Sequence, residues 1–263
     1  MHAPTLLCAV YAASSDAVVR GLRSLRWQVR SLELDTKEWS APLLSMMTLL
    51  GNESVNAIWH PEHSAATRDE RPTADTSPAA RESYIRRKYE TRAFTSEEGI
   101  PEPNALHRAA ATNDVVLAVR CLAHRFDMDA PAPPNPSGPF WGASEVAAHS
   151  GRSALQVAAA CGSEEVLELL LQNMASTSRS GVDGADEVSG KTALRLAVEA
   201  AHAGCVHQLI TRGANISHAD SAQQTPMQVA VELGHVEISE AMLAYKLAQD
   251  EKLLRQIDVG DAE

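Results

Sequence analysis

The sequence predicts an all-α protein built from short helix pairs that stack into an array. One phrase recurs four times in the second half of the chain, as NALHRAA, SALQVAA, TALRLAV and TPMQVAV. A second apolar run follows each phrase after a short interval, so each unit offers two short helices. Because one such pair cannot bury its apolar face alone, neighbouring pairs are expected to share a continuous core. An aromatic content of only 4% suits a core of alanine and leucine.

The spacing of the four phrases indicates the kind of repeat. Their anchor residues Leu106, Leu155, Leu194 and Met227 are 49, 39 and 33 residues apart. The last interval equals the ankyrin period of about 33 residues, and the phrase is close to the ankyrin T-P-L-H-x-A. The second half of the chain therefore resembles ankyrin repeats, which we assign to residues 103–263.

Turn and insertion signals divide the repeat region further. Gly162 and Gly234 fall between the two helices of their units, and Gly204 is expected at the matching place of the third unit. The proline-rich insertion at 130–142 favours extended backbone and is expected to be a solvated loop or a docking motif. The Ser- and Gly-rich insertion at 173–190 is expected to be mobile.

The last helix is expected to continue well beyond the repeat that contains it. The stretch from Ile238 to Ile257 keeps a helical pattern and carries charged residues such as Glu240, Lys246 and Asp250. Terminal units of repeat proteins usually present a polar outer face. We therefore expect this helix to close the array as a polar cap.

Charge is distributed unevenly along the chain. The net charge is −11, with 12 basic against 13 acidic residues in residues 1–100 and 11 against 21 in residues 101–263. A field of that sign disfavours nucleic acid and anionic lipid as partners of the second half. The four cysteines are far apart in sequence and form no C-x-x-C pair, which favours a reducing, cytoplasmic location. No apolar run approaches the roughly 20 residues of a membrane span.

The first hundred residues predict a smaller, mainly helical module. Alternating residues around 29–35 predict one short strand near 30–34. A helix is expected to open at Pro42 and to end at Gly51, and a second short helix follows up to Trp59. A polar loop leads to a helix predicted over residues 79–94.

These pieces, in this order, resemble the later part of an ArfGAP domain. The similar stretches are residues 29–35 with Trp39, the sequence GNESVN at 51–56 with Trp59, and residues 71–90, which resemble the closing helix. The ArfGAP-like part is placed at residues 29–95 and a linker at 96–102. By resemblance, the matching motif positions are Arg30, Asp35, Trp39, Gly51, Asn52, Asn56, Trp59, Lys88 and Tyr89.

The front of the ArfGAP domain is where this sequence departs from the family. That domain begins with a zinc finger, C-x2-C-x16-C-x2-C, followed by a catalytic arginine. Counting back from residue 29 places this arginine at Arg20 and the second cysteine pair at Ala12 and Ser15, with the first pair before Met1. A structural zinc site needs four ligands, so we expect neither zinc nor another cofactor, a degenerate segment over 1–28, and weak order there.

For each candidate residue, a second explanation stands beside the one that the resemblance implies. The resemblance implies an arginine finger at Arg20, whereas the alternative that the missing zinc ligands favour is one surface arginine of an Arg-rich stretch. Lys88 and Tyr89 belong to the closing helix, where packing is the expected role of Tyr89. Asn52 and Asn56 are expected to cap a turn or form a buried hydrogen bond, the alternative being contact with a partner.

Two functions follow from the resemblance. The first is a regulator of Arf-type small GTPases, not an enzyme in itself, whose GTPase-activating role is impaired by the missing ligands. The alternative is a catalytically silent scaffold that binds proteins through its ankyrin repeats. Both imply protein partners, no nucleic acid, no transmembrane segment, and a cytoplasmic location or one peripheral to membranes through the partners.

Overall fold

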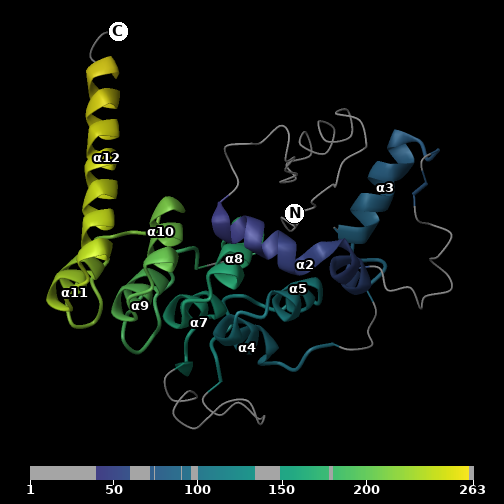
Figure 1. Ribbon diagram of the computed structural model, residues 1–263, viewed down its shortest axis with the longest axis horizontal. Coiled ribbons are helices and arrows are strands. Elements are labelled where there is room, and N and C mark those ends of the chain that lie inside the picture. The colour runs from purple at the N-terminus through teal and green to yellow at the C-terminus, as the bar shows by residue number, and fades with distance from the viewer. Residues whose placement is uncertain are drawn as a thin grey trace.

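The computed structural model describes residues 40–59, 72–73, 75–89, 91–95, 100–133, 149–177 and 180–260. Within these ranges the protein is all-α, as predicted, and Figure 1 shows its helices arranged as a row of pairs with a smaller module at one end. The strand predicted near residues 30–34, the weakly ordered segment and the 134–148 part of the first insertion lie outside the described residues.

Four helix pairs form the array in the described part of the chain, and this confirms the number predicted from the phrases. In each pair an inner helix comes first and an outer helix follows. The inner helices pack on one another in sequence, as do the outer helices. The pairs are α4 (Ala105–Thr112) with α5 (Val115–Ala123), α7 (Ala154–Cys161) with α8 (Glu164–Thr177), α9 (Ala193–Glu199) with α10 (Ala203–Thr211), and α11 (Pro226–Glu232) with α12 (Val236–Gly260).

The first residue of the phrase explains where three of the inner helices begin. The hydroxyls of Ser153, Thr192 and Thr225 each accept a hydrogen bond from the backbone N–H three residues later. Gln156 and Gln228 complete reciprocal capping boxes at the first and last of these sites. Such caps satisfy backbone donors that a short helix otherwise leaves unpaired.

The turn between the two helices of each unit uses left-handed backbone at one fixed position. Nine residues after the cap, φ is 55° at Asn113, 73° at Gly162, 57° at Ala201 and 73° at Gly234. The assignment of Gly204 to this turn was therefore wrong, because Ala201 occupies the position. Gly204 instead lies in α10, where an added Cβ would clash with the Glu164 carboxylate.

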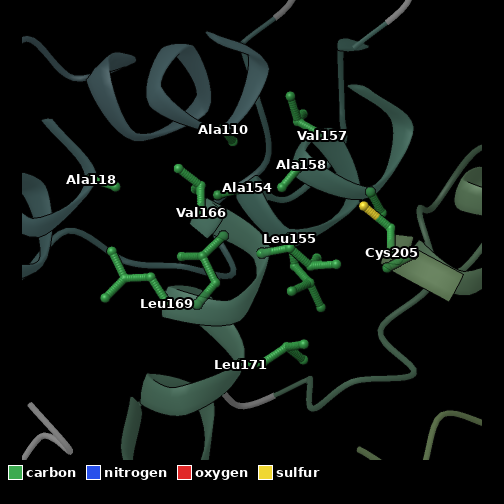
Figure 2. Packing of buried hydrophobic residues seen from close by; sticks show 14 of the residues in the cluster. Ala110, Ala118, Ala154, Leu155, Val157, Ala158, Val166, Leu169, Leu171 and Cys205 are labelled. Carbon is green, nitrogen blue, oxygen red and sulfur yellow. The ribbon is translucent and has the colours of Figure 1, made fainter. Parts of the chain in front are cut away.

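The core runs continuously between the pairs. Ala110, Ala154 and Ala158 are buried where inner helices meet, while Val166 and Leu169 fill the space beside the outer helices (Figure 2). Alanine at these contacts lets the helix axes approach closely, and the larger side chains then pack in the spaces between them. The apolar faces of the first three pairs are thus covered by their neighbours.

Among the described residues, the N-terminal module contributes two helices. α2 (Ala41–Trp59) is interrupted at Gly51, where φ is 55° and ψ is 163°, so its two halves match the two helices predicted. α2 packs on the outer helices α5 and α8. α3 covers Pro78–Tyr89 and ends before the predicted Phe94. The chain reverses through Arg92, whose φ is 57°, and this places the Phe94 ring against Tyr84 at 5.4 Å between centroids.

The second insertion contains a helix end and a turn. Residues 173–177 complete α8, and residues 180–190 form a turn around Asp186. The mobility expected for this insertion stays a prediction. The Asp186 carboxylate accepts hydrogen bonds from the backbone N–H groups of Val188, Ser189 and Lys191 and from the Ser189 hydroxyl. Burial raises the pKa of Asp186, but these hydrogen bonds outweigh it and hold the pKa below its ordinary value.

The polar cap expected at the end of the array is only partly present. α12 does run on to Gly260, and charged residues such as Glu240 and Lys246 are exposed. However, Leu243 and Leu247 on the same helix are exposed as well. The end of the array is therefore not a polar face throughout.

Replacement of Ala201 by glycine is expected to stabilise the protein. Left-handed backbone costs an L-residue about 1–2 kcal/mol, and glycine avoids this cost at a smaller entropic penalty. We expect Ala201→Gly to raise the urea midpoint of unfolding, with a gain of about 0.5–1 kcal/mol. The matched control is Ala200→Gly, whose φ is −85°, so that variant should lower the midpoint. A lower midpoint for Ala201→Gly would contradict the strain at this turn.

Candidate functional site

The interruption at Gly51 positions the predicted motif residues of the N-terminal module. After it, the second half of α2 carries Asn56 and Trp59 towards the end of α3. Trp59 is fully buried, and its ring centroid lies 5.3 Å from that of Tyr89 in a tilted arrangement. Tilted aromatic pairs are favoured over face-to-face stacking. Tyr89 is thus buried and packed against Trp59, and its role in the domain stays a prediction.

Lys88 is buried beside this aromatic pair. Its Nζ donates a hydrogen bond to Asn56 Oδ1 at 2.5 Å and lies 5.1 Å from the centre of the Tyr89 ring. A buried ammonium needs such partners, since removing it from water is costly. Asn56 itself is exposed, and it accepts this hydrogen bond from another predicted motif residue.

Arg92 completes the site, although nothing in the sequence singled it out. Its guanidinium lies 5.7 Å from the Trp59 ring centre, and one terminal nitrogen donates to the Ala123 carbonyl at 2.8 Å. That carbonyl belongs to the last turn of α5, where backbone acceptors lack helical partners. Burial, and then the nearby charge of Arg125, lower the pKa of Arg92 to about 10. Arg92 thus fastens the N-terminal module to the first repeat.

A second link joins the module to the repeats through Glu165 at the start of α8. Its carboxylate accepts hydrogen bonds from the Ser45 hydroxyl of α2 at 2.6 Å and from the Asn113 amide at 2.5 Å. Asn113 also accepts a hydrogen bond from the Val166 N–H. The bonds from Asn113 and then Ser45 lower the pKa of Glu165 against the effect of burial. One carboxylate therefore joins α2 and the first two repeats.

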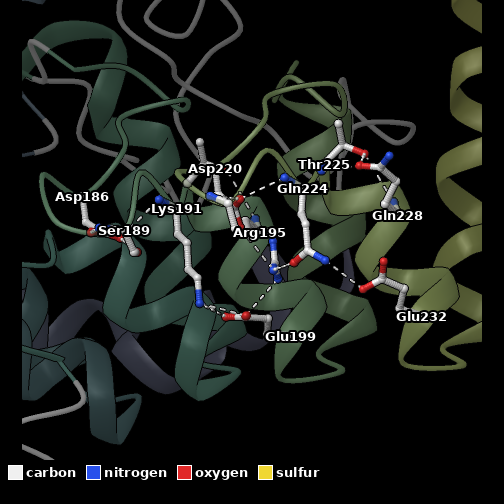
Figure 3. A network of polar contacts seen from close by, with 12 residues as sticks. Asp186, Ser189, Lys191, Arg195, Glu199, Asp220, Gln224, Thr225, Gln228 and Glu232 are labelled. Atoms are coloured by element: carbon white, nitrogen blue, oxygen red, sulfur yellow. Dashed lines mark hydrogen bonds and ion pairs between the residues drawn. The ribbon is translucent and has the colours of Figure 1, made fainter.

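In the first three units, the fourth residue of the phrase ties the inner helix to the turn that follows the unit. His107 contacts the Ala130 carbonyl at 3.0 Å through Nε2, and Gln156 donates to the carbonyls of Gly184 and Lys191. Arg195 forms a buried ion pair with Asp220 at 3.3 Å and a second pair with Glu199 at 3.0 Å, as Figure 3 shows. These contacts hold the turns in a defined row.

The turns border a partly open cavity of about 430 Å³ on one side of the second repeat. Met128, Leu155, Leu170 and Met174 give it an apolar lining, while Asp129 and Glu187 add acidic groups. Thioether side chains adapt readily to different apolar partners. The cavity can therefore accept an apolar side chain, preferably one next to a basic residue.

The structure places about half of the predicted motif residues. It brings together Asn56, Trp59, Lys88 and Tyr89, and it puts Gly51 at the bend that makes this possible. The side chain of Asn52 lies outside the described residues, and so do Arg20, Arg30, Asp35 and Trp39.

Within the described ranges, no group of side chains could bind a metal ion and no helix could span a membrane. There, no three His, Cys, Asp or Glu side chains come together as a group that could hold a metal ion. None of the three described cysteines forms a disulfide. No helix within the same ranges combines the length and the apolar character needed to span a membrane.

The geometry defines a class of protein in which a helical module is fixed onto an array of ankyrin-type helix pairs. Comparison with family models identifies both parts. The ArfGap family, described as GTPase activating protein for Arf, matches residues 8–98. An ankyrin repeat matches residues 150–180, and a model of three ankyrin repeats matches residues 177–252. The chain thus combines an ArfGap domain with C-terminal ankyrin repeats, as in the ArfGAP family members with such repeats, and the resemblance is confirmed.

The family-model matches and the structure complement each other. The ArfGap match begins at residue 8 and so includes Arg20. The first helix pair, α4 with α5, lies between the matched regions, and the structure shows that it has the same arrangement as the other pairs.

Acid is expected to weaken the link at Glu165. Its folded-state pKa is depressed, so its contribution to stability is present above the unfolded pKa of about 4.3 and is lost as the pH falls through the folded pKa. The difference in unfolding free energy between the natural protein and Glu165→Gln should thus be largest near neutral pH and shrink below about pH 4. The exposed Glu240→Gln serves as control and should show little difference at any pH. A Glu165→Gln difference that does not change with pH would contradict this role.

Proposed function

We propose that this protein binds Arf-type small GTPases through its ArfGap domain and accelerates their GTP hydrolysis only weakly. The match of residues 8–98 to GTPase activating proteins for Arf carries the proposal. The packed cluster of Asn56, Trp59, Lys88 and Tyr89 supports it, since the last helix of the domain is a formed, docked unit. The ankyrin repeats would add protein partners of their own.

The weak activity follows from the chemistry of an arginine finger. Such a guanidinium stabilises charge on the transferred phosphoryl group and contributes about 10³–10⁵ in rate. A displacement of about 1 Å can cost about 10²-fold. Arg20 has the spacing of the finger, but Ala12 and Ser15 stand at two positions where the family's zinc ligands are expected. Without metal to fix its loop, Arg20 would be poorly positioned.

The activity is tested by single-turnover hydrolysis with GTP-loaded Arf. We expect the natural chain to leave the rate close to the intrinsic one, and Arg20→Ala and Arg20→Lys to change it little. Binding of the same GTP-loaded Arf should be measured in parallel by surface plasmon resonance. Strong stimulation that disappears in both variants would contradict the impairment and identify Arg20 as a working finger. Absence of binding would contradict the proposed partner.

The expected absence of zinc is tested separately. Elemental analysis of the purified chain should find zinc well below one equivalent, because the expected ligand positions hold Ala12 and Ser15. A protein known to hold one structural zinc per chain, purified in the same way, provides the positive control. About one zinc per chain that survives mild chelation would show that other residues complete a site.

The second candidate function is a catalytically silent scaffold. The cavity beside the second repeat favours it, since Met128 and Met174 line a space large enough for a side chain and Asp129 and Glu187 supply negative charge. A partner segment with an apolar residue next to Lys or Arg suits this chemistry. Failure of Arf binding together with retained binding of such a segment would favour the scaffold over the regulator.

A further inference from the structure

The last helix pair exposes the surface that each earlier pair buries against its successor. The four units align without gaps from the cap to the outer helix, because every outer helix begins eleven residues after its cap. Equivalent positions can therefore be compared directly. At two of these positions the side chain is buried in the first three pairs and exposed in the last pair.

The first position lies near the end of the inner helix, six residues after the cap. Ala110, Ala159 and Val198 are all 0% exposed in the first three units, whereas Val231 is 65% exposed in the fourth. The second position lies in the outer helix, eighteen residues after the cap. There the first three units have Leu122, Leu171 and Ile210, at 7%, 6% and 3% exposed, and the fourth has Leu243 at 51%.

Further apolar residues extend this surface along α12. Val236 and Leu247 are exposed, and they lie seven residues before Leu243 and four residues after it. At 3.6 residues per turn these intervals bring all three side chains onto one face of the helix. Figure 1 shows α12 at the end of the array, running past the end of α10. We call Val231, Val236, Leu243 and Leu247 the end face.

We propose that the end face pairs with the end face of a second copy of this chain, so that the protein forms a symmetric dimer through α11 and α12. The end face continues the interface by which one unit packs on the next, so it fits the apolar surface of another helix pair of this type. This inference goes beyond the proposed function and does not depend on it.

Self-pairing fits better than a head-to-tail contact between copies. A head-to-tail contact would need a matching apolar surface on the first pair, and none of the exposed large apolar residues of the described ranges lies in α4 or α5. The outer helix α5 is also covered by α2. A two-fold contact uses the same surface on both copies, and it closes instead of growing into a filament.

The charge of the chain predicts how this dimer responds to salt. Each copy carries a net charge of −11, so two copies repel each other, and added salt screens that repulsion. An interface made of Val231, Val236, Leu243 and Leu247 should therefore strengthen as the salt concentration rises. An association driven by opposite charges would weaken instead.

The test is sedimentation velocity of the whole chain over about 1–100 μM, a range suited to contacts of moderate affinity. We expect the mass to rise with concentration from 28.2 kDa towards that of a dimer. The double variant Val231→Glu with Leu243→Glu should remain a monomer. Its matched control, Leu49→Glu with Val188→Glu, changes two exposed apolar residues away from the end face and should dimerise like the natural chain.

Circular dichroism and urea unfolding establish that each variant is folded. Should the double glutamate variant fail to fold, Leu243→Gln with Leu247→Gln gives an uncharged replacement with the same expected loss of dimer. A natural chain that stays monomeric at every concentration and salt level overturns the proposal. So does a folded end-face variant that dimerises like the natural chain, or a control variant that loses the dimer.

Discussion

A helix pair this short cannot bury its own apolar face, and every other feature of the fold depends on that constraint. The inner helices span only seven or eight residues, and isolated helices of that length are unstable in water. Their stability must come from the neighbouring pair. This explains the buried alanines at the contacts, the caps on the phrase residues and the ordered turns between units.

The N-terminal module takes part in this arrangement and is not merely tethered to it. α2 lies across the outer helices of the first two units, Glu165 receives hydrogen bonds from both sides, and Arg92 supplies a donor to the end of α5. Such links restrict the orientations that the ArfGap domain can adopt relative to the repeats. A partner held by the repeats would therefore sit at a defined place relative to a GTPase bound to the domain.

Much of the repeat architecture could be predicted because the recurring phrase contains the residues at which the inner helices begin. Ser153 and Thr225 signal helix starts, and the bend at Gly51 follows from the backbone that glycine permits. The turn at Ala201 could not be predicted, because alanine carries no sign of left-handed backbone. The role of Arg92 was missed because its partner, Ala123, is 31 residues away and offers only a backbone carbonyl. Contacts of that kind leave no pattern in the sequence.

The position of α2 across α5 and α8 has a consequence for how the array loses structure. In a linear array each unit is held chiefly by its neighbours, so opening tends to start at an end. α2 braces the first two units, while α11 and α12 have a neighbour on one side only among the described helices. Amide hydrogen exchange should therefore proceed as a gradient, fastest in the last helix pair and slowest beneath α2. A partner that binds the last helix pair would then slow the local unfolding of the neighbouring units, without any change in their conformation.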